Sequence, residues 1–411
     1  MQQLYSFLFF LLFPLYAMAI APKVELGVEV FFNEGHIHEL KGKKVALVTN
    51  HTGVDSKLRS TIDRLKEAAP EVKLVALFAP EHGIRGAQYA FESVEESHGP
   101  LGIPIYSLHG KTRRPTEKML QGIDVILYDI QDIGCRSYTY TTTLFYVMEE
   151  AAKRKIPVIV LDRPNPINGL TVDGPMLEEQ WRSFIGYINV PYCHGMTIGE
   201  LALFFNAHYK VGCALKVIAM RGWKRAMSYA DTGLHWIPTS PQIPEADTPL
   251  FFASTGILGE LGLVNIGVGY TLPFKVIGAP WIHAQKLADQ LNAQKLPGVT
   301  FLPFFYRPFF GSYKGKDCQG VKIVVTNRLS YRPVAVQYML IGILKNLYPT
   351  QMNAKLAALE ASKKDLFCKA NGNSQMLATL IKEKYTAWKL ILYQKQEREA
   401  FLQARSKYLL Y

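Results

Sequence analysis

The stretch KLVALFAPEHG, residues 73–83, decides the fold prediction for this 411-residue chain. The six residues after Lys73, residues 74–79, are apolar, which predicts a buried strand. Glu81 and His82 follow that strand directly, between Pro80 and Gly83. In a parallel α/β sheet, ligands bind in the crevice beyond the carboxyl ends of the strands. The stretch therefore predicts a buried strand and a reactive turn, with Glu81 as the candidate catalytic residue.

Strand-like and helix-like patterns alternate on both sides of this stretch. Further strands are predicted at residues 44–49, 103–108, 124–128, 157–161 and 215–220. Helices are predicted around residues 58–65, at 142–153 and at 197–205. The last helix opens with a capping box at Thr197 and Glu200, so we interpret Glu200 as a cap rather than a catalyst. This alternation predicts an α/β fold with a doubly wound, mostly parallel sheet.

The pattern changes at residues 240–275, where proline and glycine become dense. We place a domain junction there, with a first domain at residues 20–260 and a smaller α+β domain at residues 261–411. The second domain is predicted to have helices at 283–291 and 335–347, a strand at 321–326 and a helical tail from residue 375. The aromatic residues within 301–313 either pack in a domain interface or stack on sugar rings.

The first 19 residues differ from the rest of the chain. An apolar run at residues 7–15 precedes Ala17-Met18-Ala19, which predicts a secretory signal cut after Ala19. The protein is therefore expected to be exported, either periplasmic or secreted. The run is too short to span a bilayer comfortably, and no later stretch is typical of a transmembrane helix, so we expect no stable membrane insertion.

The charge and cysteine content narrow the classes of partner and site. A formal net charge of +12 favours anionic partners such as cell-wall polymers, acidic sugars or nucleic acid. The lysines and arginines are dispersed and form no nucleic-acid-binding motif, so we expect no nucleic acid partner. The five cysteines are scattered without metal-type spacing, and we expect mainly buried thiols.

Polar side chains follow four of the predicted strands. The first strand leads into Asn50, the second into Glu81, the third into Asp129 and the fourth into Asp162. If these strands are neighbours in one sheet, all four ends face the same crevice. One polar strand end is common, because Asp and Asn cap the helix that follows, but four together indicate a site.

The residue types at these strand ends suit the cleavage of a glycosidic bond. One carboxyl group protonates the leaving oxygen, and a second activates water or attacks the anomeric carbon. We predict Glu81 as the catalytic acid, with Asp129 or Asp132 as the second carboxylate. Arginines nearby would bind a carboxylate bidentately, and tyrosines would pack on a ring. The candidate substrate-binding residues from these segments are Asn50, His82, Arg85, Gln131, Arg136, Tyr138, Tyr140, Asp162, Arg163, Asn165 and His194.

Other chemistries have weaker signals. No G-x-G-x-x-G follows the first strand, and there is no P-loop and no G-x-S-x-G, so a dinucleotide cofactor is disfavoured. His36 and His38 have no convincing third metal ligand. His51, His82 and His194 stand near acids, which leaves a metal-dependent hydrolase open as an alternative. We expect no cofactor and no resident metal.

Nine strings of the sequence together carry a family resemblance. They are TNHTG (49–53), PEHG (80–83), DIQDIGCRSYTY (129–140), LDRPNP (161–166), GPMLE (174–178), VPYCHGMTIGEL (190–201), PTSPQIP (238–244), CQGV (318–321) and KYLLY (407–411). In this order they resemble the exo-β-N-acetylmuramidases of peptidoglycan turnover. The resemblance covers essentially the whole chain after the signal segment.

The resemblance implies a Rossmann-like catalytic domain and a smaller C-terminal auxiliary domain, with a cleft between them. It implies a glycoside hydrolase that releases N-acetylmuramic acid (MurNAc) from the non-reducing end of peptidoglycan fragments, including muropeptides and MurNAc-GlcNAc. The proposed catalytic glutamate of the family lies in the PEHG motif, which corresponds to Glu81 as general acid/base. No nicotinamide cofactor is implied, and a basic protein suits a substrate with an anionic lactyl group.

One segment departs from the family pattern. Many members carry an EGTN-x-S-x-GRGT-like stretch before a Pro-Phe dipeptide. Residues 260–271 here keep Glu260, which we add to the candidate substrate-binding residues, but Val268 replaces the usual arginine. The departure keeps open a second class, a cell-wall glycan-binding protein without turnover. A metal-dependent hydrolase of a cell-wall amide or ester is the third alternative.

Overall fold

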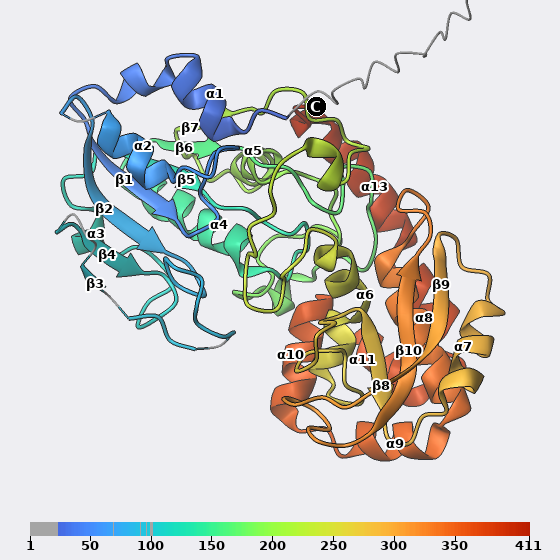
Figure 1. Cartoon of the computed structure of the whole chain (residues 1–411). Coiled ribbons are helices and arrows are strands. Elements are labelled where there is room, and N and C mark those ends of the chain that lie inside the picture. Colours follow the sequence, from blue (N-terminus) through green and yellow to red (C-terminus); the bar gives the residue numbers. More distant parts are fainter. Residues whose placement is uncertain (1–23, 69, 91, 96, 99–101) are drawn as a thin grey trace, which may run out of the picture.

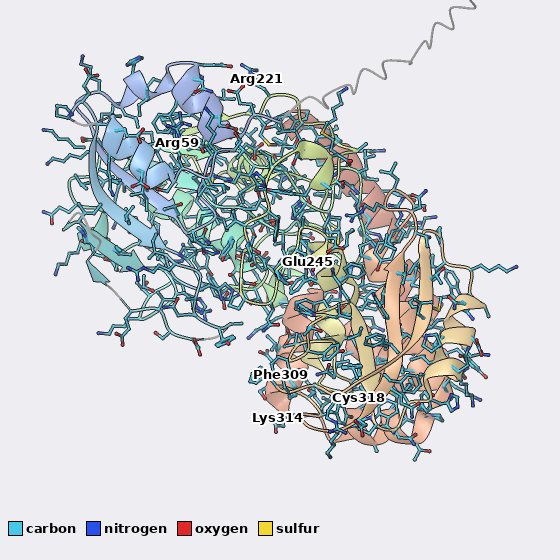
Figure 2. All side chains as sticks on the ribbon, viewed as in Figure 1. Arg59, Arg221, Glu245, Phe309, Lys314 and Cys318 are labelled. Atoms are coloured by element: carbon cyan, nitrogen blue, oxygen red, sulfur yellow. The ribbon has the colours of Figure 1, made fainter. Side chains whose placement is uncertain are left out.

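The computed structural model describes residues 24–411, except residues 69, 91, 96 and 99–101 (Figure 1). The predicted signal segment, residues 1–19, lies outside the described residues. Within the described part, every helix is too short or too polar to cross a bilayer. The basic side chains are spread over both domains, with Arg59 and Arg221 exposed on the first and Lys314 on the second (Figure 2).

The first domain is built on one twisted sheet with the strand order β3-β4-β2-β1-β5-β6-β7. Its strands are β1 (Lys44–Thr49), β2 (Lys73–Ala79), β3 (Ser97–His98), β4 (Pro104–Ser107), β5 (Val125–Asp129), β6 (Val158–Leu161) and β7 (Leu215–Ile218). Neighbouring strands are parallel except β3, which runs antiparallel to β4. Strand order reverses direction between β1 and β5, the switch point of a doubly wound fold. The predicted fold class is confirmed.

Side chains of the parallel strands alternate between two separate cores, because successive residues of a strand point to opposite faces. Val45 and Leu47 of β1 join one core with α1 (Gly27–Asn33) and α2 (Thr61–Glu67). Ala46 and Val48 join the other core with α4 (Thr139–Lys153) and α5 (Ile198–His208). Helices therefore cover both faces, as Figure 1 shows. The shorter elements are η1 (His36–Leu40), α3 (Glu117–Leu120), η2 (Glu179–Trp181) and η3 (Ala230–Thr232).

The carboxyl ends of β2, β1, β5 and β6 lie side by side, since these strands are consecutive in the sheet. This confirms the condition under which the four polar strand ends share one edge. The capping box at the start of α5 is confirmed as well: Glu200 N donates to Thr197 Oγ1, and Thr197 N donates to the Glu200 carboxylate.

The second domain contains an antiparallel sheet in the order β8-β10-β9, with helices packed on it. Its strands are β8 (Val276–Ala279), β9 (Val299–Tyr306) and β10 (Cys318–Val325). Its helices are α6 (Thr248–Glu260), α7 (Ala284–Asn292), α8 (Pro333–Leu347), α9 (Pro349–Ala357), α10 (Ala361–Asn371), α11 (Gln375–Lys382), α12 (Ala387–Leu392) and α13 (Lys395–Arg405), followed by η4 (Ser406–Tyr408). The predicted smaller α+β domain is confirmed.

The main elements that the sequence did not predict are helices α1, α6, α9 and α10 and strands β8 and β9. The glycines of α6 obscured its helical pattern, but Gly259 is required by close packing: a Cβ there would lie 2.4 Å from Ile266 Cδ1. Strand β9 falls within the aromatic segment, whose run of Phe and Pro gave no clear alternation. The predicted domain junction after residue 260 lies at the end of α6, whereas α6 packs on α8 and α10, so in the structure this helix belongs to the second domain.

Candidate active site

A cavity of about 560 Å³ lies between the two domains. Glu81 and His82 line it from the end of β2, and residues 137–139 line it from the start of α4. The second domain contributes side chains of α6 and α10 and the loop around Phe310. Its volume falls in the range of about 300–1,000 Å³ that is usual for small-molecule sites.

Glu81 reaches this cavity from the turn after β2. His82 and Gly83 take left-handed backbone angles, with φ of 69° and 77°. The Glu81 side chain is buried, and Thr139 Oγ1 donates a hydrogen bond of 2.6 Å to its Oε2. Its other oxygen, Oε1, lies 3.5 Å from Nε2 of His109. Thr139 sits at the first position of α4, so the start of that helix fixes the carboxylate.

His109 is a buried imidazole that the sequence did not single out. It follows β4, the neighbour of β2 in the sheet, and so belongs to a fifth polar strand end. Burial lowers its pKa, while the adjacent Glu81 raises it and Arg113 and His82 lower it further. Within the described part of the chain, its Nδ1 has no hydrogen-bond partner. His109 is therefore a neutral ring held against the Glu81 carboxyl.

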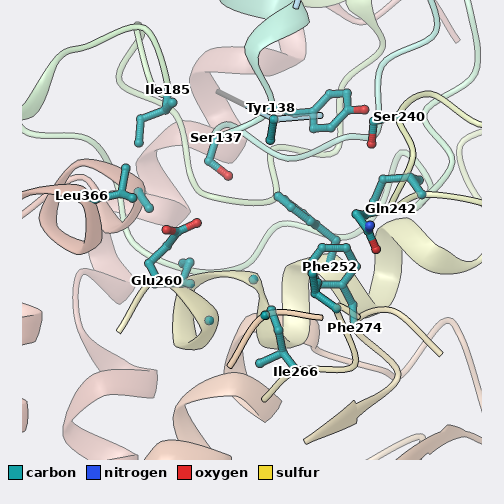
Figure 3. A pocket seen from close by; sticks show the side chains of 18 of the residues that line it. Ser137, Tyr138, Ile185, Ser240, Gln242, Phe252, Glu260, Ile266, Phe274 and Leu366 are labelled. Carbon is teal, nitrogen blue, oxygen red and sulfur yellow. The ribbon is translucent and has the colours of Figure 1, made fainter. Parts of the chain in front are cut away.

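Glu260 is the second carboxyl group of the cavity. It ends helix α6, and its carboxyl points into the cavity toward Ser137 (Figure 3). Burial raises its pKa to about 7, and the positive charge of Lys363 opposes that rise. A carboxyl group with this pKa changes protonation state near neutral pH, which is the range in which a general acid or base works best.

Apolar side chains form the wall of the cavity beside Glu260. Phe252 and Phe274 pack edge to face with ring centroids 5.1 Å apart, and Ile266 lies next to them (Figure 3). Ser240, near Tyr138, and Gln242, near Phe252, bring polar groups to the cavity lining (Figure 3). Such a surface suits a sugar ring, because C–H faces pack on aromatic side chains while hydroxyls meet polar atoms.

Four of the predicted site residues line the cavity: Glu81, His82, Tyr138 and Glu260. His82 Nδ1 lies 2.7 Å from the carbonyl of Gln88, which fixes the ring on the following loop. The Tyr138 hydroxyl donates to Thr239 Oγ1 at 2.8 Å. These contacts hold the two side chains in place at the cavity edge.

Asp129, one of the two predicted second carboxylates, does not line the cavity. Both of its oxygens are bound by the Arg163 guanidinium, at 2.6 and 3.0 Å, and Thr61 Oγ1 donates to Oδ2. Asp129 and Arg163 are almost fully buried. The pair links β5 to the segment after β6, so its geometry is that of a structural ion pair inside the first domain.

Asp132 and Asp162 are also buried away from the cavity. Burial raises the pKa of each to about 7. Asp132 Oδ2 accepts from Gly134 N at 2.7 Å, and its Oδ1 has no partner among the described residues. Asp162 accepts from Thr197 Oγ1 and Gly199 N at 2.8 Å, which anchors it to the start of α5.

The remaining predicted residues contact the protein itself. Arg136 donates to the carbonyls of Pro175 and Val190 in the first domain, and to those of Ala370 and Asn371 in α10. It therefore holds α10 on the first domain. Arg85 is exposed and does not line the cavity.

The other polar candidates are buried in short-range networks. Burial lowers the pKa of His194 to about 3, with Arg405 and Arg136 adding to the effect. Asn50 accepts from Thr52, Gln131 donates to the carbonyl of Pro164, Asn165 donates to that of Met196, and the Tyr140 hydroxyl donates to that of Thr239. None of these five residues lines the cavity.

The side-chain positions bear on the metal-dependent alternative and on the predicted state of the cysteines. Among the described residues, no group of three or more His, Cys, Asp or Glu side chains is placed to hold a metal ion. All five cysteines are buried and free, which confirms the expectation of buried thiols.

Several cavity residues carried no usable sequence signal. Thr139 and Ser240 lie in strings that the resemblance included, yet nothing in their spacing marked them. Lys363 is one of three lysines on a surface helix, and nothing in the sequence distinguishes it from Lys364 and Lys369. His109 could have been found by extending the count of polar strand ends to the strand at 103–108.

Comparison with known proteins identifies the family. The N-terminal model of the exo-β-N-acetylmuramidase NamZ family matches residues 45–247, and its C-terminal model matches residues 250–411. The chain belongs to the exo-β-N-acetylmuramidase NamZ family. The resemblance inferred from the nine strings is thereby confirmed, and by this membership the chain is a glycoside hydrolase.

Individual members of the NamZ and DUF1343 families are similar to this chain along nearly its whole length. The peptidoglycan β-N-acetylmuramidase NamZ of Bacillus subtilis strain 168 is 39% identical over 391 residues, which is 95% of this chain and 92% of that protein. The crystal structure of a DUF1343 family protein from Bacteroides fragilis NCTC 9343 has a TM-score of 0.88 at 42% identity. A second DUF1343 protein from that organism has a TM-score of 0.72 at 27% identity. Both structures cover 95% of this chain, and the chain covers 99% of each.

Proposed function

We propose that this NamZ-family protein releases N-acetylmuramic acid from the non-reducing end of peptidoglycan fragments. The observation that carries the proposal is the position of Glu81 and Glu260, two carboxyl groups that face one inter-domain cavity with an apolar wall. Cleavage of a glycosidic bond needs such a pair. The Bacillus subtilis relative is a peptidoglycan β-N-acetylmuramidase, which supports the same substrate class.

In the proposed mechanism Glu81 is the general acid/base. Its proton passes to the glycosidic oxygen as the bond from that oxygen to the anomeric carbon breaks. Glu260 accepts a proton from the water whose oxygen attacks the anomeric carbon. The products are the free sugar and the shortened fragment, and both protons are accounted for. A base with a pKa near 7 suits this step, because it is ionised yet still basic at neutral pH.

Thr139 and His109 position the Glu81 carboxyl in this proposal. The Thr139 hydroxyl holds Oε2 at 2.6 Å, and the His109 ring lies against Oε1. Oriented carboxyl groups save the cost of arranging them during the reaction. The role of His109 is thus to keep Glu81 aimed at the cavity while remaining neutral.

The test is product analysis on a MurNAc-GlcNAc fragment and on a chromogenic β-MurNAc glycoside. Wild-type protein should release free MurNAc, and Glu81→Gln should release none above background while still binding the fragment. Binding by the wild type with no sugar released after prolonged incubation would instead favour the glycan-binding alternative. Activity abolished by chelation and restored by a divalent metal would favour the metal-dependent hydrolase.

We also propose that the protein works outside the cytoplasm, as the apolar run and Ala17-Met18-Ala19 predict. Expression in a bacterial host followed by fractionation tests this. Mature protein beginning at residue 20 should appear in the periplasm or the medium. Full-length protein retained in the cytoplasm would contradict the proposal.

A further inference from the structure

The charged side chains that line the cavity are few and unevenly balanced. Among the described lining residues there are two carboxyl groups, Glu81 and Glu260, one imidazole, His82, and one permanent cation, Lys363. A substrate that carries a carboxylate has to be recognised in this setting. An uncompensated carboxylate next to two glutamates would be repelled.

Lys363 is positioned to meet a ligand. It lies on the same face of α10 as Leu366 and Ala370, at intervals of three and four residues, and all three line the cavity. Its Nζ lies over Gly262, since a Cβ built there would be 3.6 Å away. Gly262 has a left-handed φ of 62°, and the ammonium fills the space above it.

The Lys363 ammonium has no carboxylate within ion-pair distance in the described part of the chain. Lys369 of the same helix, by contrast, pairs with Asp365 at 2.6 Å. Lys363 acts on Glu260 only through its charge, which lowers the Glu260 pKa. Its side chain is exposed at the cavity rim, so an incoming anion can reach it.

Two other cationic side chains of the first domain, Arg136 and Arg85, do not contribute to the cavity lining. Arg136 donates from its two terminal nitrogens to four backbone carbonyls and does not line the cavity. Arg85 does not line the cavity. Val268, at the position where the family pattern has an arginine, does line it, and adds only apolar surface.

We propose that Lys363 binds the carboxylate of the substrate's lactyl group and thereby selects the acidic sugar over a neutral one. The inference rests on the proposed function and deepens it, because it names the residue that sets specificity. The carboxylate at the rim would pair with Lys363 while the sugar ring packs on the wall of Phe252 and Phe274.

The experiment compares two chromogenic β-MurNAc glycosides that differ only at the lactyl group, one a free acid and the other its methyl ester. In Lys363→Met, kcat/KM for the acid should fall roughly 10- to 100-fold, as expected for the loss of a charged hydrogen bond. The value for the ester should stay within about twofold, since charge-assisted pairing is the only contact removed. Lys363→Arg should keep most of the preference for the acid.

Lys364→Met is the matched control. Lys364 is the next residue of α10, has the same charge, and does not line the cavity, so its substitution should leave both substrates unchanged. An equal loss on acid and ester in Lys363→Met would show that Lys363 acts only through Glu260. An unchanged preference would overturn the assignment outright.

A binding measurement separates this inference from the proposed function. Calorimetry with free MurNAc and with its lactyl methyl ester needs no turnover. Wild type should bind the acid more tightly than the ester, and Lys363→Met should bind both alike. If neither glycoside is cleaved but this binding difference is found, the proposed function fails while the role of Lys363 stands. Equal binding of the acid by wild type and Lys363→Met would overturn it.

Discussion

Two pairs of carboxyl groups in this protein differ in what their oxygens contact. Asp129 and Asp162 lie at the ends of adjacent strands, and their oxygens are taken up by Arg163, Thr197, and backbone or hydroxyl groups of the first domain. Glu81 and Glu260 instead line the cavity between the domains. A position at the end of a strand places a carboxyl group at the edge of the sheet. A substrate can reach that carboxyl group only where it also lines the cavity between the domains.

The largest effect is expected at Glu81. Glu81→Gln keeps an oxygen that can accept from Thr139 but cannot transfer a proton, so kcat should fall about 10²–10⁴-fold. The melting temperature should change little, because the hydrogen bond at Oε2 survives. Steady-state kinetics measures the change in kcat, and calorimetry on the same sample measures the change in melting temperature. Turnover within tenfold of wild type would remove Glu81 from the mechanism.

At Asp129 we expect a large loss of stability with little loss of activity, the reverse of the result expected at Glu81. Asp129→Ala leaves the buried Arg163 cation without its partner, and removing one member of a buried pair costs about 3–5 kcal/mol. Denaturant unfolding should therefore show a much weaker first domain, with near-normal activity in the fraction that stays folded.

The double variant Asp129→Ala with Arg163→Met is the control for this experiment, and should recover part of the lost stability because no buried charge remains. A catalytic loss of more than 100-fold in Asp129→Ala, with unfolding unchanged, would instead support the second-carboxylate role predicted from the sequence.

The pH dependence of wild-type activity tests Glu260. Its pKa is raised to about 7, and as a base it must lose its proton to act. The value of kcat/KM should therefore rise roughly tenfold per pH unit below about pH 7 and level off above it. Glu260→Gln should abolish this limb and lower the rate. A rate that falls as pH rises through 7 would mean that Glu260 donates the proton and Glu81 is the base.

The smallest effect is expected at Asp132. Its folded-state pKa is raised to about 7 above an ordinary value of 3.8, so its stability contribution is complete at low pH and is lost as pH rises through 7. Asp132→Asn keeps an acceptor for Gly134 and buries no charge. Its melting temperature should exceed that of wild type by about 2–6 °C at pH 8 and match it near pH 4.

Thermal unfolding of both proteins at the two pH values measures this difference. Activity measured on Asp132→Asn then bears on its predicted catalytic role. A stable variant with activity reduced more than 100-fold would restore Asp132 as a candidate second carboxylate.

The sequence was sufficient to predict the parallel sheet and the place of Glu81 at a strand end facing the cavity, because buried parallel strands and the turns after them leave strong local patterns. It was not sufficient to separate Asp129 from Glu81, since both directly follow strands. Their difference arises from strand order, which places Arg163 beside Asp129. Lys363 and His109 are separated from Glu81 in sequence, and only the folded chain brings Lys363 to the same cavity and His109 against the Glu81 carboxyl.

Helix α6 shows a second limit of sequence patterns. Its two glycines reduce helical propensity, and the close contact of Gly259 with Ile266 is one that no local pattern reveals. Glu260 was therefore found through the family resemblance rather than through its place at the end of a helix.

The last residue of the chain is part of the first domain. The Tyr411 hydroxyl donates to Asp162 at 2.6 Å and accepts from Met220 N at 2.8 Å, and its ring packs edge to face on Trp223. The first domain thus receives a core contact from a residue that follows the whole second domain in the sequence. It follows that the first domain completes its packing only after the second domain has been synthesised and the closing segment has returned.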